Sequence, residues 1–251
     1  MPDLLIIGSA AGVPTEARFC TSLAVRTEQH LYLIDAGAPV STLLCRLGED
    51  PLKVDTVFLS HMHSDHVAGL PLLLQHNHLL HRRKPLAIYG PWDTARRLRC
   101  LLHDLLLGVD RLSFPLSLHD VVLGQPILLP DLTVTFFPTT HYLGFAPHAP
   151  QPMSCGLIVE TGNKRLVISG DLGRQDDLVP YLEGCDILLH EFGHWKLEEI
   201  ADFAALHRVP HLVVYHLHHE WERREEEMWR VIRKRYGGEL TLARDLMRLQ
   251  L

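Results

Sequence analysis

The sequence predicts an α/β protein with a core of two β-sheets and helices on the outer faces. The chain has 251 residues, of which 47% are hydrophobic and 22% are charged, which is enough for a large core. Apolar segments with strand character come first, and strands and helices alternate towards the end. Helices that cover a two-sheet core fit this order. No linker, repeat or charge block divides the chain, so residues 1–251 are expected to form a single domain.

Apolar and β-branched residues between turn-forming residues predict the strands. The segments 21–26 and 30–35 are expected to pair across the polar turn between them. The segment 54–60 has the composition of a buried strand. The expected strands are 4–7, 21–26, 30–35, 54–60, 86–90, 127–129, 132–137, 156–160, 166–170, 187–190 and 212–215.

Helices are expected in segments between these strands and after the last of them. One opens after His66, with Pro71 tolerated in its first turn. The segment 220–235 carries an apolar stripe that begins at Trp221, which we expect to be part of the core, and two glycines follow it. The expected helices are 40–47, 67–74, 91–106, 176–182, 195–207 and 220–235.

The segment from His61 to His66 is the most informative part of the sequence. It holds four polar residues in H-x-H-x-D-H order: His61, His63, Asp65 and His66. Such a group is unfavourable in a core, because each buried polar ring needs its own hydrogen-bond partner. Neutral imidazole and carboxylate are good ligands for Zn²⁺, Mn²⁺ or Fe²⁺. We therefore interpret the segment as metal-binding rather than as a solvated, histidine-rich loop.

The position of this segment supports the interpretation. It lies between an expected strand and an expected helix, where a rigid scaffold holds functional side chains. In an extended loop His61, His63 and Asp65 would alternate onto one side, so the loop must bend to bring in His66. Four ligands this close would crowd one tetrahedral ion, so two neighbouring ions are expected.

Three further candidate ligands stand where apolar strands end: His141, Asp171 and His216. Loops at strand ends are where binding sites are built. Each residue also has a plain alternative role, as a loop histidine, a turn former or a member of a surface histidine cluster. Together with the segment 61–66, the three supply the complement of ligands for two metal ions.

Composition and charge restrict the partners and the compartment. The formal net charge is −6, so steering of a large nucleic acid by the whole molecule is not expected. No apolar run approaches the roughly 20 residues of a membrane span, and no signal-peptide pattern is visible. The five cysteines are scattered, so free thiols in a reducing cytoplasm are expected.

These residues resemble the motifs of the metallo-β-lactamase superfamily. Its five motifs have counterparts in this order: Asp35, the segment 61–66, His141, Asp171 and His216. The N-terminal pattern is more similar to the ribonuclease Z-like branch, which also contains phosphodiesterases and arylsulfatase-like hydrolases. That pattern is Gly8…Gly12-Val13-Pro14…Arg18…Thr21-Ser22. The resemblance covers nearly the whole chain and implies an αββα sandwich of two mixed β-sheets.

The resemblance implies two ligand sets that share one carboxylate. The implied sets are His61, His63 and His141 for the first metal ion and Asp65, His66 and His216 for the second, with Asp171 bridging the two. Zn²⁺ is the first expectation for both ions, and Mn²⁺ and Fe²⁺ suit the same ligands.

The resemblance also implies roles around the metal ions. Asp35 would accept a hydrogen bond from a ligand imidazole and fix its tautomer. His194 matches a histidine that assists the leaving group in this branch, although a helix-start histidine bonded to backbone is an equal alternative. Tyr142 and His148 are candidate substrate contacts because they closely follow His141.

The chain departs from ribonuclease Z in one respect. That enzyme carries a long insertion between its third and fourth motifs, a flexible arm that grips tRNA. Here only residues 142–170 separate His141 from Asp171, and two expected strands occupy much of that length. We therefore do not expect tRNA 3′ processing, and the acidic balance agrees, because duplexes are bound mainly through Lys and Arg. A small molecule or short nucleic acid is the expected substrate, and the resemblance implies a homodimer.

The expected reaction is hydrolysis by metal-bound hydroxide, which two metal ions generate near neutral pH. Asp65 would orient or deprotonate the water, and His194 would protonate the leaving oxygen.

The leading substrate class is a small or cyclic phosphodiester or a short RNA. Lactonase, thioesterase and arylsulfatase-like activities stay open as alternatives on the same fold. A di-iron redox protein is disfavoured because His63 stands where those proteins carry glutamate. A non-catalytic, metal-stabilised domain is disfavoured because structural sites need fewer ligands.

Overall fold

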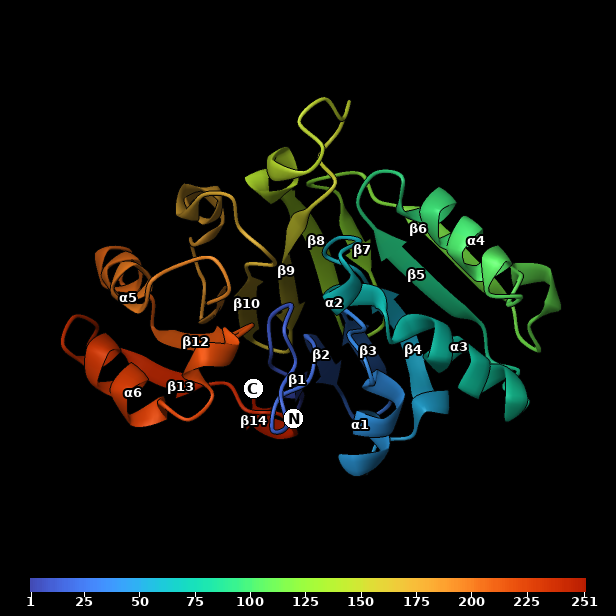
Figure 1. Cartoon of the computed structure of the whole chain (residues 1–251), viewed down its shortest axis with the longest axis horizontal. Helices are drawn as coiled ribbons and strands as arrows, with labels where there is room; N and C mark the ends of the chain where they lie inside the picture. Colours follow the sequence, from blue (N-terminus) through green and yellow to red (C-terminus); the bar gives the residue numbers. More distant parts are fainter.

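Two seven-stranded β-sheets lie face to face in the centre of the molecule (Figure 1). The computed structural model describes residues 1–251. In spatial order, the first sheet contains β14 (Met247–Gln250), β1 (Asp3–Gly8), β2 (Ser22–Arg26), β3 (Leu31–Ile34), β4 (Val54–Phe58), β5 (Leu86–Gly90) and β6 (Leu116–Asp120). The second contains β13 (Glu239–Leu242), β12 (His211–Tyr215), β11 (Ile187–Glu191), β10 (Lys164–Ile168), β9 (Cys155–Thr161), β8 (Thr133–Pro138) and β7 (Pro126–Leu128).

Both sheets are mixed, and each has a parallel part. Strands β3 to β6 are parallel in the first sheet, and β10 to β13 are parallel in the second. The remaining neighbours pair antiparallel. Because parallel strands need crossover connections, these parts of the chain carry the helices. The predicted αββα sandwich of two mixed sheets is confirmed.

The α-helices other than α2 lie on the two outer faces of the sandwich (Figure 1). The α-helices are α1 (Val40–Arg46), α2 (Ser64–Val67), α3 (Leu70–Leu79), α4 (Thr94–Asp104), α5 (Leu197–Leu206) and α6 (Glu225–Arg233). Short 3₁₀ helices are η1 (Pro51–Lys53), η2 (Val109–Arg111), η3 (Thr140–Gly144), η4 (Gln175–Tyr181) and η5 (His219–Trp221). Helices α1, α3 and α4 cover the first sheet, whereas α5 and α6 cover the second. None of these helices is long and apolar enough to cross a membrane.

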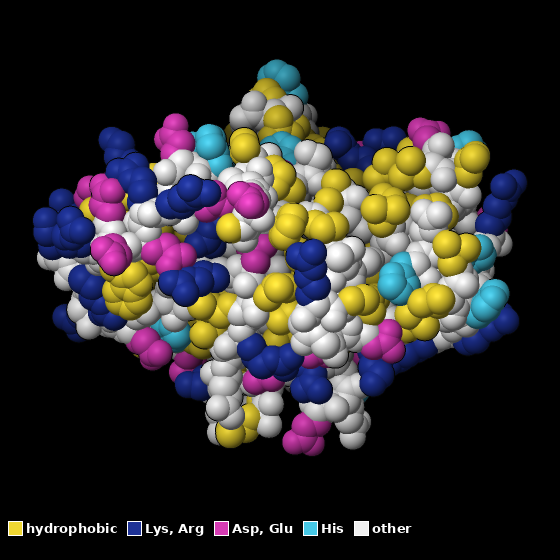
Figure 2. Space-filling view, turned by 60° about the horizontal axis from the view of Figure 1, so that its bottom comes forward, with side chains coloured by type: hydrophobic (Ala, Val, Ile, Leu, Met, Phe, Trp, Pro, Cys, Tyr) yellow, Lys and Arg dark blue, Asp and Glu magenta, His cyan; other side chains and the backbone are white.

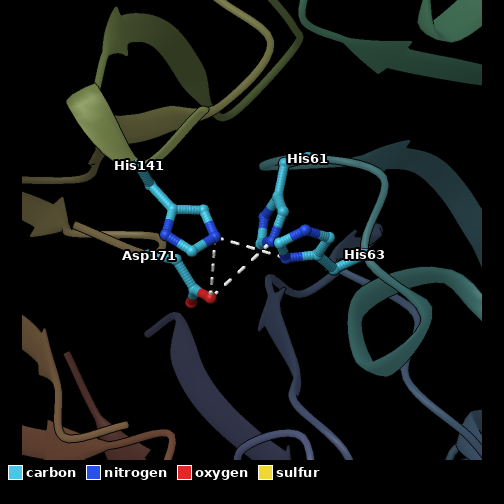
Figure 3. A group of neighbouring side chains, drawn as sticks. All are labelled: His61, His63, His141 and Asp171. Atoms are coloured by element: carbon cyan, nitrogen blue, oxygen red, sulfur yellow. Dashed lines mark hydrogen bonds and ion pairs between the residues drawn. The ribbon is translucent and has the colours of Figure 1, made fainter. Parts of the chain in front are cut away.

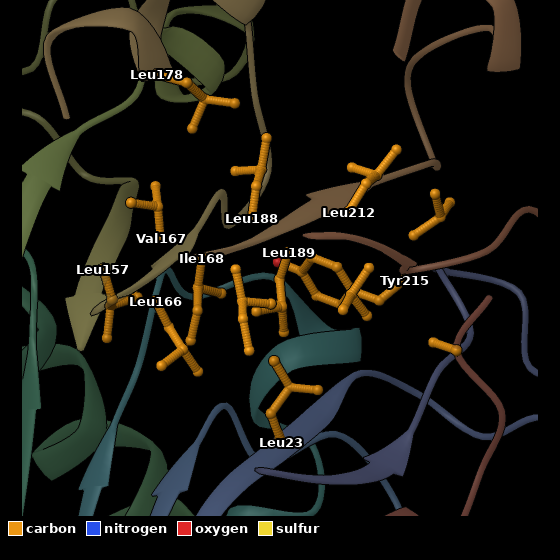
Figure 4. Close-up of a cluster of buried hydrophobic side chains, with 14 of the residues drawn as sticks. Leu23, Leu157, Leu166, Val167, Ile168, Leu178, Leu188, Leu189, Leu212 and Tyr215 are labelled. Carbon is orange, nitrogen blue, oxygen red and sulfur yellow. The ribbon is translucent and has the colours of Figure 1, made fainter. Parts of the chain in front are cut away.

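Alternating side chains of the strands divide the core into two clusters. In β1, Leu4 and Ile6 belong to a cluster of 42 buried residues that fills the space between the sheets and extends beneath α5 and α6. Leu5 and Ile7 belong instead to a cluster of 22 residues beneath α1, α3 and α4. Figure 4 shows the same alternation in the second sheet, where Leu166 lies on the side of Leu23 of β2 and Val167, Leu188 and Leu212 lie on the other. This period of two is what fixes the register of each strand.

The predicted helix 220–235 is wrong at its start. The chain forms η5, turns at 222–224 and begins α6 only at Glu225. Contacts with the N-terminal loop explain the break, because the Glu222 carboxylate accepts hydrogen bonds from the Thr15 hydroxyl and from the Ala17 N–H at 3.1 Å. The apolar stripe itself is confirmed as core, since Met228, Ile232 and Tyr236 are buried.

Three strands at the edges of the sheets were not predicted from the sequence. They are β6, β13 and β14, which combine short length with polar residues on alternate positions. The predicted helix at 176–182 is a 3₁₀ helix, η4, with Pro180 inside it, a residue that cannot donate a backbone hydrogen bond. The segment 61–66 is not an extended loop throughout, because Asp65 and His66 belong to α2.

Charged side chains of both signs are interspersed on the face shown in Figure 2, where Lys and Arg are most frequent around α6. Arginines of this region pair with carboxylates: Arg224 with Glu227 at 2.8 Å and Arg235 with Asp202 at 3.0 Å. Acidic side chains therefore lie among the basic ones on that face.

Arg18 anchors the loop between β1 and β2. Its guanidinium is buried and donates hydrogen bonds to the Ser9 hydroxyl at 2.7 Å and the Ala243 carbonyl at 2.6 Å. It also pairs with Glu225 at 2.8 Å. The loop therefore connects β1 with the start of α6 and with the segment after β13.

Replacing Arg18 with alanine is expected to lower the free energy of unfolding by about 2–4 kcal/mol, because it leaves buried acceptors without a donor. Urea unfolding of the variant measures this change. Arg235→Ala is the matched control, because the Arg235–Asp202 pair is exposed and such pairs contribute about 0–1 kcal/mol. Equal losses in the two variants would contradict the anchoring role.

Candidate metal centre

The predicted ligands meet at one end of the sandwich. The segment 61–66 follows β4, His141 lies in η3 after β8, and Asp171 and His216 follow β10 and β12. Strands that run in the same direction end at the same edge of a sheet, and sites form there. The packing of two sheets then brings the ends of β4, β8, β10 and β12 together.

One group of four side chains faces a common point (Figure 3). It consists of His61, His63, His141 and Asp171, whose nearest ligand atoms all lie within 4.8 Å of one another. The His141 Nε2 and His63 Nδ1 atoms are 3.2 Å apart. The Asp171 Oδ2 atom lies 3.7 Å from His61 Nε2 and 3.6 Å from His141 Nε2.

A second group lies on the other side of the same carboxylate. Asp65, His66 and His216 present ligand atoms within 4.8 Å of one another. The Asp171 Oδ1 atom is 3.4 Å from His66 Nε2 and 3.4 Å from His216 Nε2. The two oxygens of Asp171 therefore face two different groups of ligand atoms.

The chemistry of these side chains fits divalent metal ions. The His61 Nε2, His66 Nε2 and Asp171 Oδ1 atoms are buried without a hydrogen-bond partner, which costs about 1–3 kcal/mol for each group left unsatisfied. Burial holds the pKa of His61 well below its ordinary value and lowers the pKa of His141 to about 4. Both rings are therefore neutral near pH 7, the state in which imidazole binds a metal ion.

Hydrogen bonds to the Nδ1 atoms of His66 and His216 orient these two rings. Asp35 is buried and accepts hydrogen bonds from the Ser60 N–H at 2.7 Å and from His66 Nδ1 at 2.8 Å. The Thr21 hydroxyl lies 2.6 Å from His216 Nδ1. In both histidines Nδ1 is occupied, so Nε2 is the atom left for a metal ion.

Asp35→Asn is expected to weaken metal binding by about 10–100-fold, since such outer hydrogen-bond partners are typically worth that much. The amide keeps the size of the side chain but exchanges one acceptor oxygen for a donor, so it cannot accept from both Ser60 and His66. Titration of metal-free protein with Zn²⁺ measures the affinity. Asp55→Asn, on the neighbouring strand β4 and far from the ligands, should leave the affinity unchanged. An unaltered Zn²⁺ affinity in Asp35→Asn would contradict the role.

The backbone is constrained at two positions of the centre. Asp35 and His216 have positive φ angles of 57° and 54°, which non-glycine residues seldom adopt. Strain of this kind is concentrated at functional sites. Gly37 allows the loop after β3 to approach the centre, because a Cβ there would lie 2.6 Å from the Thr21 carbonyl oxygen.

His194 stands at the rim of the centre, next to His141. The two rings have centroids 4.9 Å apart. Its Nδ1 lies 3.0 Å from Oε1 of the fully buried Glu191, whose Oε2 accepts the His194 backbone N–H. The hydrogen bond and charge of Glu191 raise the pKa of His194 to about 9. The side chain is thus bonded to a carboxylate rather than to backbone, and it is 40% exposed.

Two cavities open onto the ligands. A smaller one of about 240 Å³ contains Asp65, Asp171 and His216, and a larger one of about 620 Å³ contains Phe145 and Trp195. His63, His141 and His194 line both.

Two predicted substrate contacts do not line either cavity. Tyr142 donates its backbone N–H to the Ser154 hydroxyl, and His148 is exposed on the following loop. Sequence reasoning missed Phe145 and Trp195, although each stands within four positions of a predicted site residue. An aromatic residue close to a predicted site residue is the sequence signal that could have identified them.

An αββα sandwich with a histidine and aspartate centre at one end of its sheets defines a metal-dependent hydrolase of the metallo-β-lactamase type. The chain belongs to the β-lactamase superfamily, since the family model of the β-lactamase superfamily domain matches residues 30–237.

Relatives that match nearly the full length are ribonuclease Z proteins, in agreement with the ribonuclease Z-like branch. That of Methanothermobacter thermautotrophicus is 25% identical over 90% of this chain and 89% of its own length. That of Pseudomonas putida is 27% identical over 99% of this chain and 97% of its own, in an alignment of 319 residues. That alignment is longer than this chain, so the relative carries residues that this chain lacks. The match to ribonuclease Z of Methanococcus maripaludis, at 31% identity, spans 55% of this chain and 45% of the relative.

Solved structures agree with the fold. The metallo-β-lactamase fold protein YhfI from Bacillus subtilis has a TM-score of 0.80 at 22% identity, covering 98% of both chains. The short form of human tRNase Z has a TM-score of 0.77 at 24% identity, covering 99% of this chain and 98% of its own. A diphosphatase of the PhnP family has a TM-score of 0.73 at 18% identity, covering 100% of this chain and 98% of its own.

Proposed function

We propose that this protein hydrolyses a small or cyclic phosphodiester with two divalent metal ions. The ligands proposed are His61, His63 and His141 for one ion, Asp65, His66 and His216 for the other, and Asp171 for both. The observation that carries the proposal is the position of Asp171. Its Oδ2 atom lies within 3.7 Å of His61 and His141, and its Oδ1 atom lies 3.4 Å from His66 and from His216.

When bound, divalent ions lower the pKa of water and neutralise negative charge on a phosphoryl oxygen. The side chains of this protein supply the rest. The Asp65 carboxylate lines the smaller cavity, where it can hold the attacking water and accept its proton. His194, oriented by Glu191, can deliver a proton to the leaving oxygen.

The cavities favour a small substrate. Neither is lined by a lysine or arginine, the residues through which proteins bind the phosphates of a long nucleic acid. The link from η3 to β9 is a short loop, so no arm of the kind that grips tRNA extends from this part of the chain. Ribonuclease Z relatives are named for activity on RNA, and a short RNA would be the largest substrate that this centre is proposed to take.

Zn²⁺ is the metal we propose, because imidazole and carboxylate are its usual ligands; Mn²⁺ and Fe²⁺ suit the same donors. Elemental analysis of purified protein would give both the identity and the stoichiometry of the metal, with two ions per chain expected.

A reducing cytoplasm is the proposed compartment, supported by the five free cysteines. The homodimer stays a prediction.

A parallel assay tests the proposed reaction. Metal-loaded protein is incubated with bis-p-nitrophenyl phosphate, a cyclic nucleotide, a homoserine lactone and an aryl sulfate. Phosphodiester cleavage that disappears with a chelator and returns with Zn²⁺ is expected. Strong lactone or sulfate turnover without phosphodiester cleavage would contradict the proposal and favour one of the other hydrolase activities.

A further inference from the structure

We propose that Phe145, Leu172 and Trp195 form a pocket for one planar aromatic ring of the substrate, carried by the leaving group. The inference rests on the proposed phosphodiester hydrolysis and adds the chemical class of the group that is released. It comes from the larger of the two cavities at the centre, whose apolar wall takes no part in holding metal ions.

The larger cavity has the size of a small-molecule site. Its volume of about 620 Å³ lies within the roughly 300–1,000 Å³ of ligand pockets. It reaches the centre through His63, His141 and His194, which it shares with the smaller cavity. A substrate whose phosphate lies at these histidines therefore has room for one further group on this side.

Aromatic side chains line the larger cavity. The Phe145 ring lies 4.6 Å from the His63 ring and 5.5 Å from the His141 ring, measured between centroids, yet 43% of the residue is exposed. Trp195, on the segment after His194, packs against the main core and is thereby held in place. Leu172 is almost fully buried beside them. Aromatic rings stack on other planar rings, and an exposed ring at a cavity wall is available for such a contact.

The positions of Asp65 and His194 assign the pocket to the leaving group. In an in-line displacement the attacking and leaving oxygens are on opposite sides of phosphorus. Asp65 lines only the smaller cavity, whereas His194 lines both. The water attacks from the Asp65 side and gives its proton to Asp65. The new bond joins the water oxygen to phosphorus, the ester P–O bond breaks, and the leaving oxygen takes a proton from His194.

The charge of the lining limits the ring-bearing group further. His194 is the one cationic side chain that lines the larger cavity, and it is assigned to the leaving oxygen; since no lysine or arginine lines this cavity, a second phosphate would lack a positive partner of its own. The group is therefore an uncharged aryl ring or a nucleobase on its sugar, attached to a single phosphate.

Ligands with one phosphate and different rings test the pocket. Adenosine 5′-monophosphate, phenyl phosphate and ribose 5-phosphate are titrated into Zn²⁺-loaded protein by calorimetry, a readout independent of turnover. Both ring-bearing ligands are expected to bind about 10-fold more tightly than ribose 5-phosphate, in line with base–aromatic stacking. In Phe145→Ala this advantage should be lost, while ribose 5-phosphate binding is unchanged.

Leu143→Ala is the matched control. Leu143 is exposed in η3, two positions before Phe145, but lines neither cavity, so all three affinities should equal those of the unmodified protein. An advantage restricted to phenyl phosphate or to the adenosine ligand supports the pocket and identifies the ring as aryl or nucleobase. Equal affinities of all three ligands, or a ring advantage that survives in Phe145→Ala, would overturn the inference.

The outcome is separable from that of the proposed function. Cleavage of bis-p-nitrophenyl phosphate without any ring-dependent binding would overturn the pocket alone. Ring-dependent binding without phosphodiester cleavage would overturn the proposed reaction and leave the pocket supported.

Discussion

Asp171→Asn is expected to lower phosphodiester turnover by about 10³-fold or more, since metal ions contribute several kcal/mol of charge stabilisation in the transition state. An asparagine side chain has a single oxygen, and its NH₂ group cannot bind a metal ion. It can therefore serve one group of histidines but not both, although Oδ1 and Oδ2 of Asp171 face different groups. Turnover and bound Zn²⁺ per chain are the two measurements, and the metal content is expected to fall as well.

Asp176→Asn is the control for this change. Asp176 is an exposed carboxylate in η4, only five positions further along the chain, and contributes to neither cavity. Circular dichroism should show that both variants are folded. A folded Asp171→Asn variant with unchanged activity and full metal content would refute the shared-carboxylate assignment.

His194→Ala is expected to slow hydrolysis by about 10²–10⁴-fold for a substrate with an alkoxide leaving group, the usual range for a lost general acid. The loss should be far smaller for p-nitrophenyl esters, because p-nitrophenolate leaves without a proton. Comparing methyl p-nitrophenyl phosphate with a dialkyl or cyclic nucleotide substrate measures the difference. A purely structural histidine would slow both substrates equally, so an equal loss would contradict proton donation.

His148→Ala serves as the histidine control. His148 is exposed on the loop before β9 and lines neither cavity, so its removal should change neither substrate's rate. The same variant tests the sequence-based prediction that His148 contacts the substrate. A raised KM in His148→Ala would restore that role.

Several parts of the fold were predictable because their signals are local. The apolar residues that end β10 are followed three positions later by Asp171, and those of β12 are followed directly by His216. Edge strand β14 was not predictable, since it has only four residues with alternating exposure and is stabilised by its pairing with β1. The break before α6 likewise depends on Glu222 meeting the loop that contains Thr15.

By itself the sequence determined the types of candidate ligand, their spacing in 61–66 and their places at strand ends, because these follow from residue chemistry and from periods within a few residues. Only the tertiary structure decided which oxygen of Asp171 faces which histidines, and that His194 is held by Glu191. It also decided that Phe145 and Trp195 share a cavity. Such contacts join segments far apart in the chain, as Thr21 and His216 show at a separation of 195 positions. No local pattern encodes them, since they depend on how two sheets and their loops pack.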